Sequence, residues 1–386
     1  MHLTQLASSN NPFRLSDGTL LEDLTVAWSS WGKPSAKLDN VILVFPVLTT
    51  SYNAAGLDSQ GPGASWWTSH CHQGWWNDFI GPDRAIDTNK WYVICASLLG
   101  GCYGTTGPDS INPSTGQAWG SSFPFPHISD LVDVQVRLLE HLGIQKLHSV
   151  VGASFGGYLA LDLAVRYPQF VENVVSVASG MRVTSAMQFA NFQQAMAIES
   201  DPNFQQGLCD SGNHPCWGLA LARTIALQQY VVPDELEIRC NKREKKDILV
   251  PLPWNYPINR PLESWLLHNG LEFSKRFNPH SYLRILHAWQ TWNPSLPIEE
   301  YLSPCRQQRW LVFSIDSDIC FPTQEQILLT NALKSAGVSY QSLEVSSRLG
   351  HDSFLKEPAL YTDALQQFLI KNTSVLDEIY SQQLAA

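Results

Sequence analysis

This sequence is short of charged residues, and of basic residues above all. Charged side chains make up 16% of its 386 residues, and 25 Lys and Arg face 35 Asp and Glu, which gives a formal net charge of −10. Surfaces that bind nucleic acid or anionic membranes need clustered Lys and Arg. We therefore expect no nucleic-acid partner, and an anionic small molecule would have to meet a local basic patch.

The sequence also lacks long apolar runs and paired cysteines. No run approaches the roughly 20 apolar residues that a membrane span needs, and the N-terminus shows no basic segment followed by an apolar stretch. The eight cysteines include no CxxC pair, so reduced thiols are expected. A disulfide between Cys209 and Cys216, which bracket a short loop, is the less favoured alternative. We expect a cytoplasmic protein with no membrane partner.

A Gly-x-Ser-x-Gly pattern at 152–156 separates two ordered segments. The apolar run before it predicts a buried strand, and residues 157–165 have apolar side chains at helical spacing, with Pro168 just beyond. Strand, pattern and helix together form the context of a nucleophile elbow, in which the Ser hydroxyl stands clear of the sheet. We predict that Ser154 is a nucleophile, and a structural Gly-rich turn is the alternative.

Buried strands alternate with helices at both ends of the chain, which predicts βαβ crossovers. Strands are expected at 41–45, 91–96, 147–151, 171–178, 310–315 and 340–345, with an edge hairpin strand at 20–30. Helices are expected at 128–142, 157–165, 324–336 and 358–370, and at 186–200, 217–230, 261–276 and 281–291 without strands among them. We predict an α/β-hydrolase fold, with a mostly parallel central sheet flanked by helices. Residues 1–184 and 296–386 would form the core, and 185–295 an inserted helical lid.

An unassisted Ser hydroxyl is a poor nucleophile, so Ser154 needs a base and an acid that orients it. In this fold the order along the chain is Ser, then Asp or Glu, then His, each on a loop after a late strand. Among the eleven histidines, His351 follows the last predicted strand and precedes the last helix. Asp316 and Asp318 both follow the strand that ends at residue 315, and position favours Asp318.

Attack on an ester or thioester creates an oxyanion that two backbone amides must stabilise. One is expected from Phe155, which follows the nucleophile. The other is expected from the loop after the early strand, where Leu48 is the best candidate. That loop could equally be only a packed turn.

With these residues placed, the chain resembles the homoserine O-acetyltransferase family across nearly its whole length. The matching words lie at 81–88 (GPDRAIDT), 99–116 (LGGCYGTTGPDSINPSTG), 123–124, 222–226, 276–277, 281–283, 316–322 (DSDICFP) and 350–355 (GHDSFL). The resemblance implies a ping-pong reaction in which Ser154 takes an acetyl group from acetyl-CoA and passes it to the acceptor hydroxyl. It implies no bound cofactor, and Asp318 as acid and His351 as base. Family members are commonly dimers through the lid, so a homodimer is possible.

The same resemblance suggests which residues bind the acceptor. Arg223 matches the arginine for the acceptor carboxylate, Asp352 the aspartate for its amine, and Tyr230 a tyrosine of the pocket. A guanidinium binds a carboxylate bidentately, and a carboxylate suits an ammonium. The alternatives are a salt bridge within the lid for Arg223 and a cap of the last helix for Asp352.

The departures from the family pattern concern the surroundings of the acyl-enzyme. Pro46 to Thr50 replaces the usual His-Ala-Leu-Thr-Gly, Phe155 places a bulkier side chain beside the acyl pocket, and the Trp- and His-rich loop at 65–74 has no recognised counterpart. In that loop His70, Cys71 and His72 are expected to be solvated, with no metal site. The basic run at 242–246 is expected to be exposed, with contact to CoA phosphates as the alternative.

These features together predict serine-dependent acyl transfer between a small acyl donor and a small hydroxyl acceptor. Acetyl transfer from acetyl-CoA to homoserine or a related compound is the first choice. A carboxylesterase of the same triad, which passes the acyl group to water, is the main alternative. Acetylation of a secondary-metabolite hydroxyl and a non-catalytic binding module are weaker ones.

Overall fold

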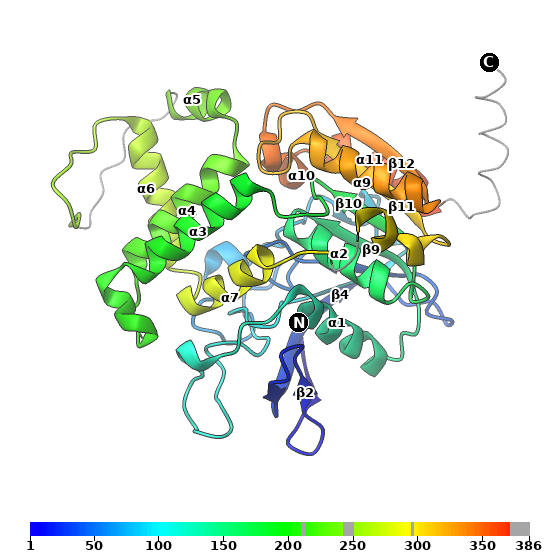
Figure 1. The fold of residues 1–386 in the computed structure, drawn as a ribbon, viewed down its shortest axis with the longest axis horizontal. Helices are drawn as coiled ribbons and strands as arrows, with labels where there is room; N and C mark the ends of the chain where they lie inside the picture. The colour runs from blue at the N-terminus through cyan, green and yellow to red at the C-terminus, as the bar shows by residue number, and fades with distance from the viewer. Residues whose placement is uncertain (210–212, 242–250, 295–296, 371–386) are drawn as a thin grey trace.

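A computed structural model describes residues 1–209, 213–241, 251–294 and 297–370 of the chain. An eight-stranded sheet forms its centre (Figure 1). In spatial order its strands are β1 (His2–Ala7), β4 (Leu24–Trp31), β8 (Tyr92–Ala96), β5 (Val41–Phe45), β9 (Leu147–Ala153), β10 (Val171–Val177), β11 (Arg309–Ile315) and β12 (Ser339–Val345). The pairs β1–β4 and β4–β8 are antiparallel and all other pairs are parallel, so the sheet is mostly parallel as predicted.

The central strands bury both of their faces. In β5, Val41, Leu43 and Phe45 belong to one core cluster, whereas Ile42 and Val44 belong to the other. This alternation explains why the strand reads as a continuous apolar run, because helices or loops cover each side of a parallel sheet. Four helices pack around the sheet: α1 (Ile128–His141), α2 (Phe155–Arg166), α9 (Thr323–Ala336) and α11 (Thr362–Ile370). Side chains of α1, α2 and α9 join the first cluster, and those of α11 join the second.

A block of helices lies between β10 and β11 in the chain and beside the sheet in space (Figure 1). Its members are α3 (Ser185–Glu199), α4 (Cys216–Tyr230), α5 (Pro233–Asn241), α6 (Pro261–Ser274) and α7 (Pro279–Gln290). We call this block the lid. It falls within the predicted range 185–295, and the division into core and lid stays a prediction.

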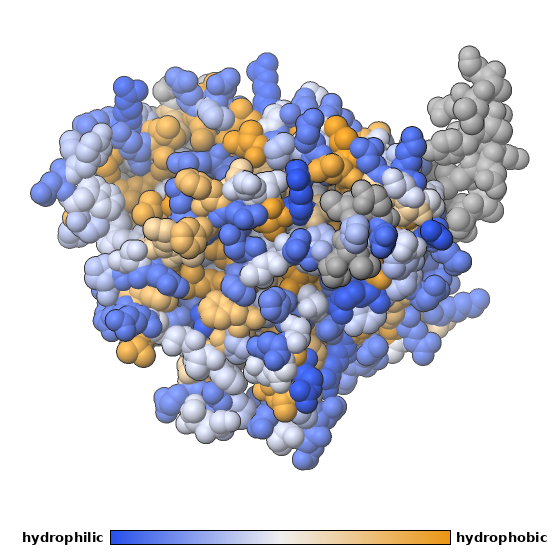
Figure 2. Space-filling model, viewed as in Figure 1, coloured by the Kyte–Doolittle hydropathy of each residue, from blue (hydrophilic) through white to orange (hydrophobic). Residues whose placement is uncertain are grey.

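Part of the lid surface is apolar. Figure 2 shows hydrophobic residues at the surface over the helices that Figure 1 labels α3, α4 and α6. On α3, Phe189, Phe192 and Met196 are 69%, 63% and 51% exposed, and their spacing places them on one side of the helix. The homodimer through the lid stays a prediction.

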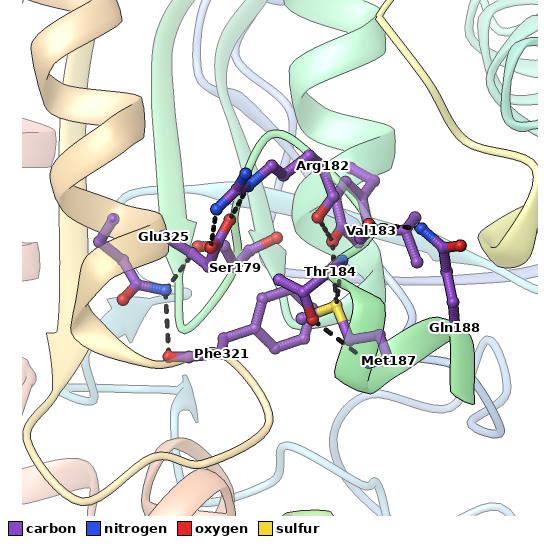
Figure 3. A network of polar contacts seen from close by, with 10 residues as sticks. Ser179, Arg182, Val183, Thr184, Met187, Gln188, Phe321 and Glu325 are labelled. Carbon is purple, nitrogen blue, oxygen red and sulfur yellow. Dashed lines mark hydrogen bonds and ion pairs between the residues drawn. The ribbon is translucent and has the colours of Figure 1, made fainter. Parts of the chain in front are cut away.

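The segment that joins β10 to α3 is tied to the core by a polar network (Figure 3). The Arg182 guanidinium contacts the Glu325 carboxylate twice, at 3.0 Å from Nε and 2.9 Å from Nη2. The Tyr158 hydroxyl donates to the Arg182 carbonyl, and the Gln326 amide donates to the Ser179 carbonyl. Glu325 and Gln326 lie in the first turn of α9, so this helix fixes the point at which the chain enters the lid.

Several expectations need correction. Residues 24–31 form an inner strand, because the N-terminal strand β1 pairs with it and takes the edge of the sheet. The helix α5 was not predicted. The expected final helix at 358–370 begins later, at Thr362, after a short α10 (Ser353–Lys356) and a turn at 358–360.

Other expectations concern thiols, membranes and the basic run. Cys209 and Cys216 do not form a disulfide. No helix within the described ranges is both long and apolar enough to cross a bilayer. The basic run at 242–246 lies outside the described residues.

Candidate active site

Ser154 lies at a sharp turn between β9 and α2. Its backbone has φ 52° and ψ −125°, which is a strained conformation for a residue with a side chain. The turn also requires glycines, because a Cβ at Gly152 would lie 2.1 Å from the Gly156 carbonyl oxygen and one at Gly157 would lie 2.3 Å from the Ser179 Cβ. The Gly-Ala-Ser-Phe-Gly-Gly segment therefore has the conformation expected of a nucleophile elbow.

Three predicted residues form a continuous hydrogen-bonded chain. His351 Nε2 lies 2.7 Å from Ser154 Oγ, and His351 Nδ1 lies 2.6 Å from Asp318 Oδ2. Ser154, His351 and Asp318 are 7%, 4% and 4% exposed. They come from β9–α2, from the loop after β12 and from the loop after β11, so the parallel sheet brings residues 197 positions apart into contact.

The geometry distinguishes the two candidate acids. Asp318 also accepts hydrogen bonds from the backbone amides of Cys320 and Phe321, at 2.8 and 2.9 Å, which hold its carboxylate toward the imidazole. Asp316 instead accepts from the Ser347 amide at 3.0 Å and thereby joins the segments that follow β11 and β12. The positional preference for Asp318 thus agrees with the structure.

Aromatic rings surround the His351 imidazole. Phe321 and Tyr230 stack on it, with ring centroids 5.4 and 5.6 Å away and interplanar angles of 19° and 29°. Phe354 contacts it edge-on at 5.2 Å. Tyr230 belongs to the lid and Phe321 to the core, so both parts of the molecule position the ring. Burial raises the pKa of Tyr230 well above its ordinary value, which keeps this hydroxyl neutral.

The hydroxyl of Ser154 opens into a cavity of about 300 Å³, which is at the small end of the usual range for ligand sites. Leu48 lines the cavity, and no acceptor among the described residues takes its backbone amide. Phe155 is the first residue of α2, where amides are without helical partners. Both positions suit the predicted oxyanion role, which stays a prediction.

The expectation that the Phe155 side chain borders the acyl pocket is wrong. That side chain is fully buried and packs against Trp289 of α7, with ring centroids 6.3 Å apart. Because α2 begins at Phe155, the first turn of this helix directs the Phe155 side chain into the core beneath the lid.

Three predicted acceptor-binding residues line the cavity: Arg223, Tyr230 and Asp352. Within the described ranges, Arg223 forms no ion pair, so the alternative of a lid salt bridge is not what the structure has. Its guanidinium lies over the rings of Tyr230 and Phe273, at 5.6 and 5.0 Å. Asp352 makes no capping hydrogen bond for α10, and its carboxylate pairs with Lys356 one turn later.

The loop at 65–74 is part of the cavity wall. His70 is exposed and His72 is partly exposed, as expected, whereas Cys71 is buried, so the expectation of a solvated segment is wrong for Cys71. His70, Cys71 and Gln73 line the cavity, and Asn53 donates to the carbonyls of residues 71 and 72. His70 reaches Glu272 of the lid at 3.5 Å. In the part of the chain that the structure describes, no three His, Cys, Asp or Glu side chains gather as metal ligands would.

The sequence assigned no role to several further lining residues, and two of them are polar residues that connect the core to the lid. Tyr103 and Arg276 lie within words that matched the family, and that match was the only signal for them. The Tyr103 hydroxyl donates to the Arg276 carbonyl at 2.7 Å, which joins the glycine-rich loop of the core to the end of α6.

Known proteins resemble this chain in both sequence and fold. A sequence model of a protein family, described as "alpha/beta hydrolase fold", matches residues 63–358. The homoserine O-acetyltransferase of Methanobrevibacter ruminantium is 35% identical, over 97% of this chain and 74% of that protein. The homoserine O-acetyltransferase of Deferribacter desulfuricans is 34% identical, over 95% of each chain. The chain belongs to the homoserine O-acetyltransferase family, within the α/β-hydrolases.

Solved structures of this fold include proteins of two activities. Esterase E22 has a TM-score of 0.84 and 26% identity, with 95% of this chain and 99% of that one covered. The homoserine O-acetyltransferase of Bacillus anthracis has a TM-score of 0.83 and 23% identity, with 96% and 97% covered. Because the two scores are nearly equal, the overall shape does not separate transferase from esterase.

Proposed function

We propose that this protein is an O-acyltransferase that moves an acetyl group from acetyl-CoA to the hydroxyl of homoserine or a related small acceptor. The observation that carries the proposal is the contact between His351 Nε2 and Ser154 Oγ, in a cavity that also contains the Arg223 guanidinium. A nucleophile with a base serves any acyl transfer, and an arginine without an acidic partner suits an acceptor that carries a carboxylate. The family to which the chain belongs supports transfer over hydrolysis.

In the first half of the reaction, Ser154 Oγ attacks the thioester carbon while its proton passes to His351 Nε2. The Leu48 and Phe155 amides stabilise the negative oxygen that forms. The carbon–sulfur bond then breaks, and the imidazolium returns the proton to the leaving thiolate. Asp318 holds the imidazole in the required tautomer and stabilises its charged form.

In the second half, the acceptor hydroxyl gives its proton to His351 Nε2 and attacks the acyl carbon. The bond between that carbon and Ser154 Oγ breaks, and Oγ takes the proton. Water can make the same attack, so acceptor affinity decides between transfer and hydrolysis. The similarity to esterase E22 therefore supports a second candidate function, hydrolysis of short acyl esters.

The deciding experiment follows free CoA and free acetate from acetyl-CoA, with and without homoserine, beside the Ser154→Ala variant as a blank. A transferase releases CoA rapidly only with homoserine, and the acetyl group appears on the acceptor. An esterase releases acetate at a rate that homoserine does not change, and that result would reject the transferase. p-Nitrophenyl acetate serves as a second donor, to detect the acyl-enzyme without CoA.

A further inference from the structure

The candidate acid and base of the triad lie on two neighbouring loops beyond the edge of the sheet. Asp318 follows β11 and His351 follows β12, and the parallel pairing of these strands ends at the last residue of each. We call residues 316–322 the acid loop and residues 346–352 the base loop. Because the sheet no longer joins the chain at these positions, contacts between the two loops set the position of the carboxylate relative to the imidazole.

The hydroxyl of Ser317 connects the two loops. It donates to the Ser347 carbonyl at 2.6 Å and accepts from the Gly350 amide at 3.2 Å. Ser317 directly precedes the acid Asp318 in the chain, and Gly350 directly precedes the base His351. One hydroxyl group therefore joins the backbone positions next to both catalytic side chains.

The base loop is itself restrained where Ser317 binds it. The Ser347 hydroxyl donates to the Glu357 carboxylate, which directly follows α10. Gly350 has φ 62°, and a Cβ there would lie 3.2 Å from the Tyr230 carbonyl oxygen of the lid. This left-handed conformation favours glycine, and the lid packs closely against it, so the direction of the Gly350 amide is restrained. The Ser317 hydroxyl thus contacts two groups that other parts of the protein hold in place.

The other contacts of the Asp318 carboxylate do not make this connection. Its Oδ1 accepts from the amides of Cys320 and Phe321, which belong to the same loop. Those hydrogen bonds orient the carboxylate within the acid loop, but they do not fix that loop relative to His351. Ser317 supplies the missing restraint.

We propose that Ser317 is a positioning residue, whose hydroxyl holds the acid loop against the base loop so that Asp318 meets the imidazole of His351 correctly. The inference rests on the proposed acyl transfer and assigns no chemical step to Ser317 itself. Its effect passes through Asp318, which stabilises the charged imidazole in both halves of the reaction. Loss of the hydroxyl should therefore slow the chemical steps and leave substrate binding nearly unchanged.

Substitutions of Ser317 test this with p-nitrophenyl acetate, through the first release of p-nitrophenol. Ser317→Ala should lower the maximal rate of Ser154 acylation about tenfold, because small displacements of catalytic groups are costly, and should change the half-saturating concentration less than about threefold. Ser317→Thr keeps a hydroxyl and should stay within about threefold of the wild type. Ser342→Ala, at an exposed serine of β12, is the matched control. A folded Ser317→Ala protein with the wild-type acylation rate would overturn the proposal.

A double-mutant cycle separates positioning from a general structural loss. If Ser317 acts through Asp318, Ser317→Ala should cost about tenfold in the wild-type background but less than about threefold in the Asp318→Asn background. The same factor in both backgrounds would show that Ser317 only supports the fold, and the inference would be wrong. Urea unfolding of each variant verifies that the rates come from folded protein.

Proton NMR observes the contact between acid and base without any substrate. The Nδ1 proton of His351 lies in a charge-assisted hydrogen bond, and such protons resonate downfield of the backbone amides. The resonance is assigned by its loss in His351→Gln. In Ser317→Ala it should move upfield and exchange faster with water, whereas Ser342→Ala should leave it unchanged. An unchanged resonance in Ser317→Ala would contradict the proposal, and so would its absence from the wild-type spectrum.

Failure of this inference can be distinguished from failure of the proposed function. If homoserine takes the acetyl group from acetyl-CoA, but Ser317→Ala reacts like the wild type, the function stands and the inference is wrong. If acetyl-CoA does not acylate Ser154, p-nitrophenyl acetate and the His351 resonance still test Ser317, because they depend on the triad and not on the natural substrates.

Discussion

Tyr230 of the lid stacks on the imidazole of His351, with 5.6 Å between the ring centroids and 29° between the planes. The base of the candidate triad is thereby in contact with a helix that the core does not contain. The Arg223 guanidinium lies 5.6 Å from the same tyrosine ring, so the arginine predicted to bind the acceptor and the predicted base both contact Tyr230. A movement of the end of α4 would change both.

This contact predicts that Tyr230 acts by its ring and not by its hydroxyl. Tyr230→Ala should lower the rate of Ser154 acylation by p-nitrophenyl acetate about tenfold or more, because the imidazole loses a restraint on one side. Tyr230→Phe keeps the ring and should stay within about threefold of the wild type. Tyr256→Ala, at a lid tyrosine that is 69% exposed, is the control. Equal losses in the Phe and Ala variants would assign the role to the hydroxyl instead.

Asp318 and Asp316 both follow β11, so substitutions of the two residues serve as test and control for the acid of the triad. Asp318→Asn should reduce kcat about 10³- to 10⁴-fold, because an amide cannot hold the neutral imidazole in the tautomer that accepts the serine proton. Asp316→Asn should change kcat less than about threefold, since its carboxylate contacts a turn and not the imidazole. Hydrolysis of p-nitrophenyl acetate measures both variants. A large loss in Asp316→Asn with little loss in Asp318→Asn would reverse the assignment.

The triad could be predicted from the sequence because topology restricts it. In a parallel sheet the loops after successive strands meet at one edge, so a serine after β9 and a histidine after β12 converge wherever the strands are correctly identified. Asp316 and Asp318 both satisfied this rule, and position only favoured the second. The structure decides between them, because hydrogen bonds from the Cys320 and Phe321 amides hold the Asp318 carboxylate toward the imidazole.

The rest of the site depends on contacts between segments that no local pattern connects. Arg276 reaches the cavity because α6 ends beside Tyr103, and His70 does so because its loop meets Glu272 of the lid. Phe155 was misplaced for a similar reason, because the position of Trp289 decides what lies above the start of α2. Packing between lid and core therefore determined these positions, and the spacing of residues along the chain did not contain that information.

We expect the ion pair between Arg182 and Glu325 to stabilise the attachment of the lid to the core. Glu325 is 4% exposed, so Arg182→Gln leaves a buried carboxylate without its partner. Since the arginine side chain is 53% exposed, we expect a loss of about 1–2 kcal/mol in the free energy of unfolding, below the cost for a fully buried pair. Urea unfolding measures it, with Lys146→Gln in an exposed pair with Glu172 as the control. Equal losses in the two variants would show that the Glu325 pair is no more than a surface contact.

We expect His280 of α7 to make the free energy of unfolding depend on pH. Burial, and then the positive charge of Arg284, lower the pKa of His280 to about 4, against about 6.5 in an unfolded chain. Between pH 6.5 and 4 the unfolded state therefore binds a proton that the folded state does not, and stability falls as the pH drops through this range. His280→Asn should remove about 1–3 kcal/mol of the loss between pH 7 and 4.5, whatever its effect at pH 7. His141→Asn, at an exposed position on α1, should leave the slope unchanged. Urea unfolding at a series of pH values gives both slopes, and a His280→Asn slope equal to that of the wild type would contradict the prediction.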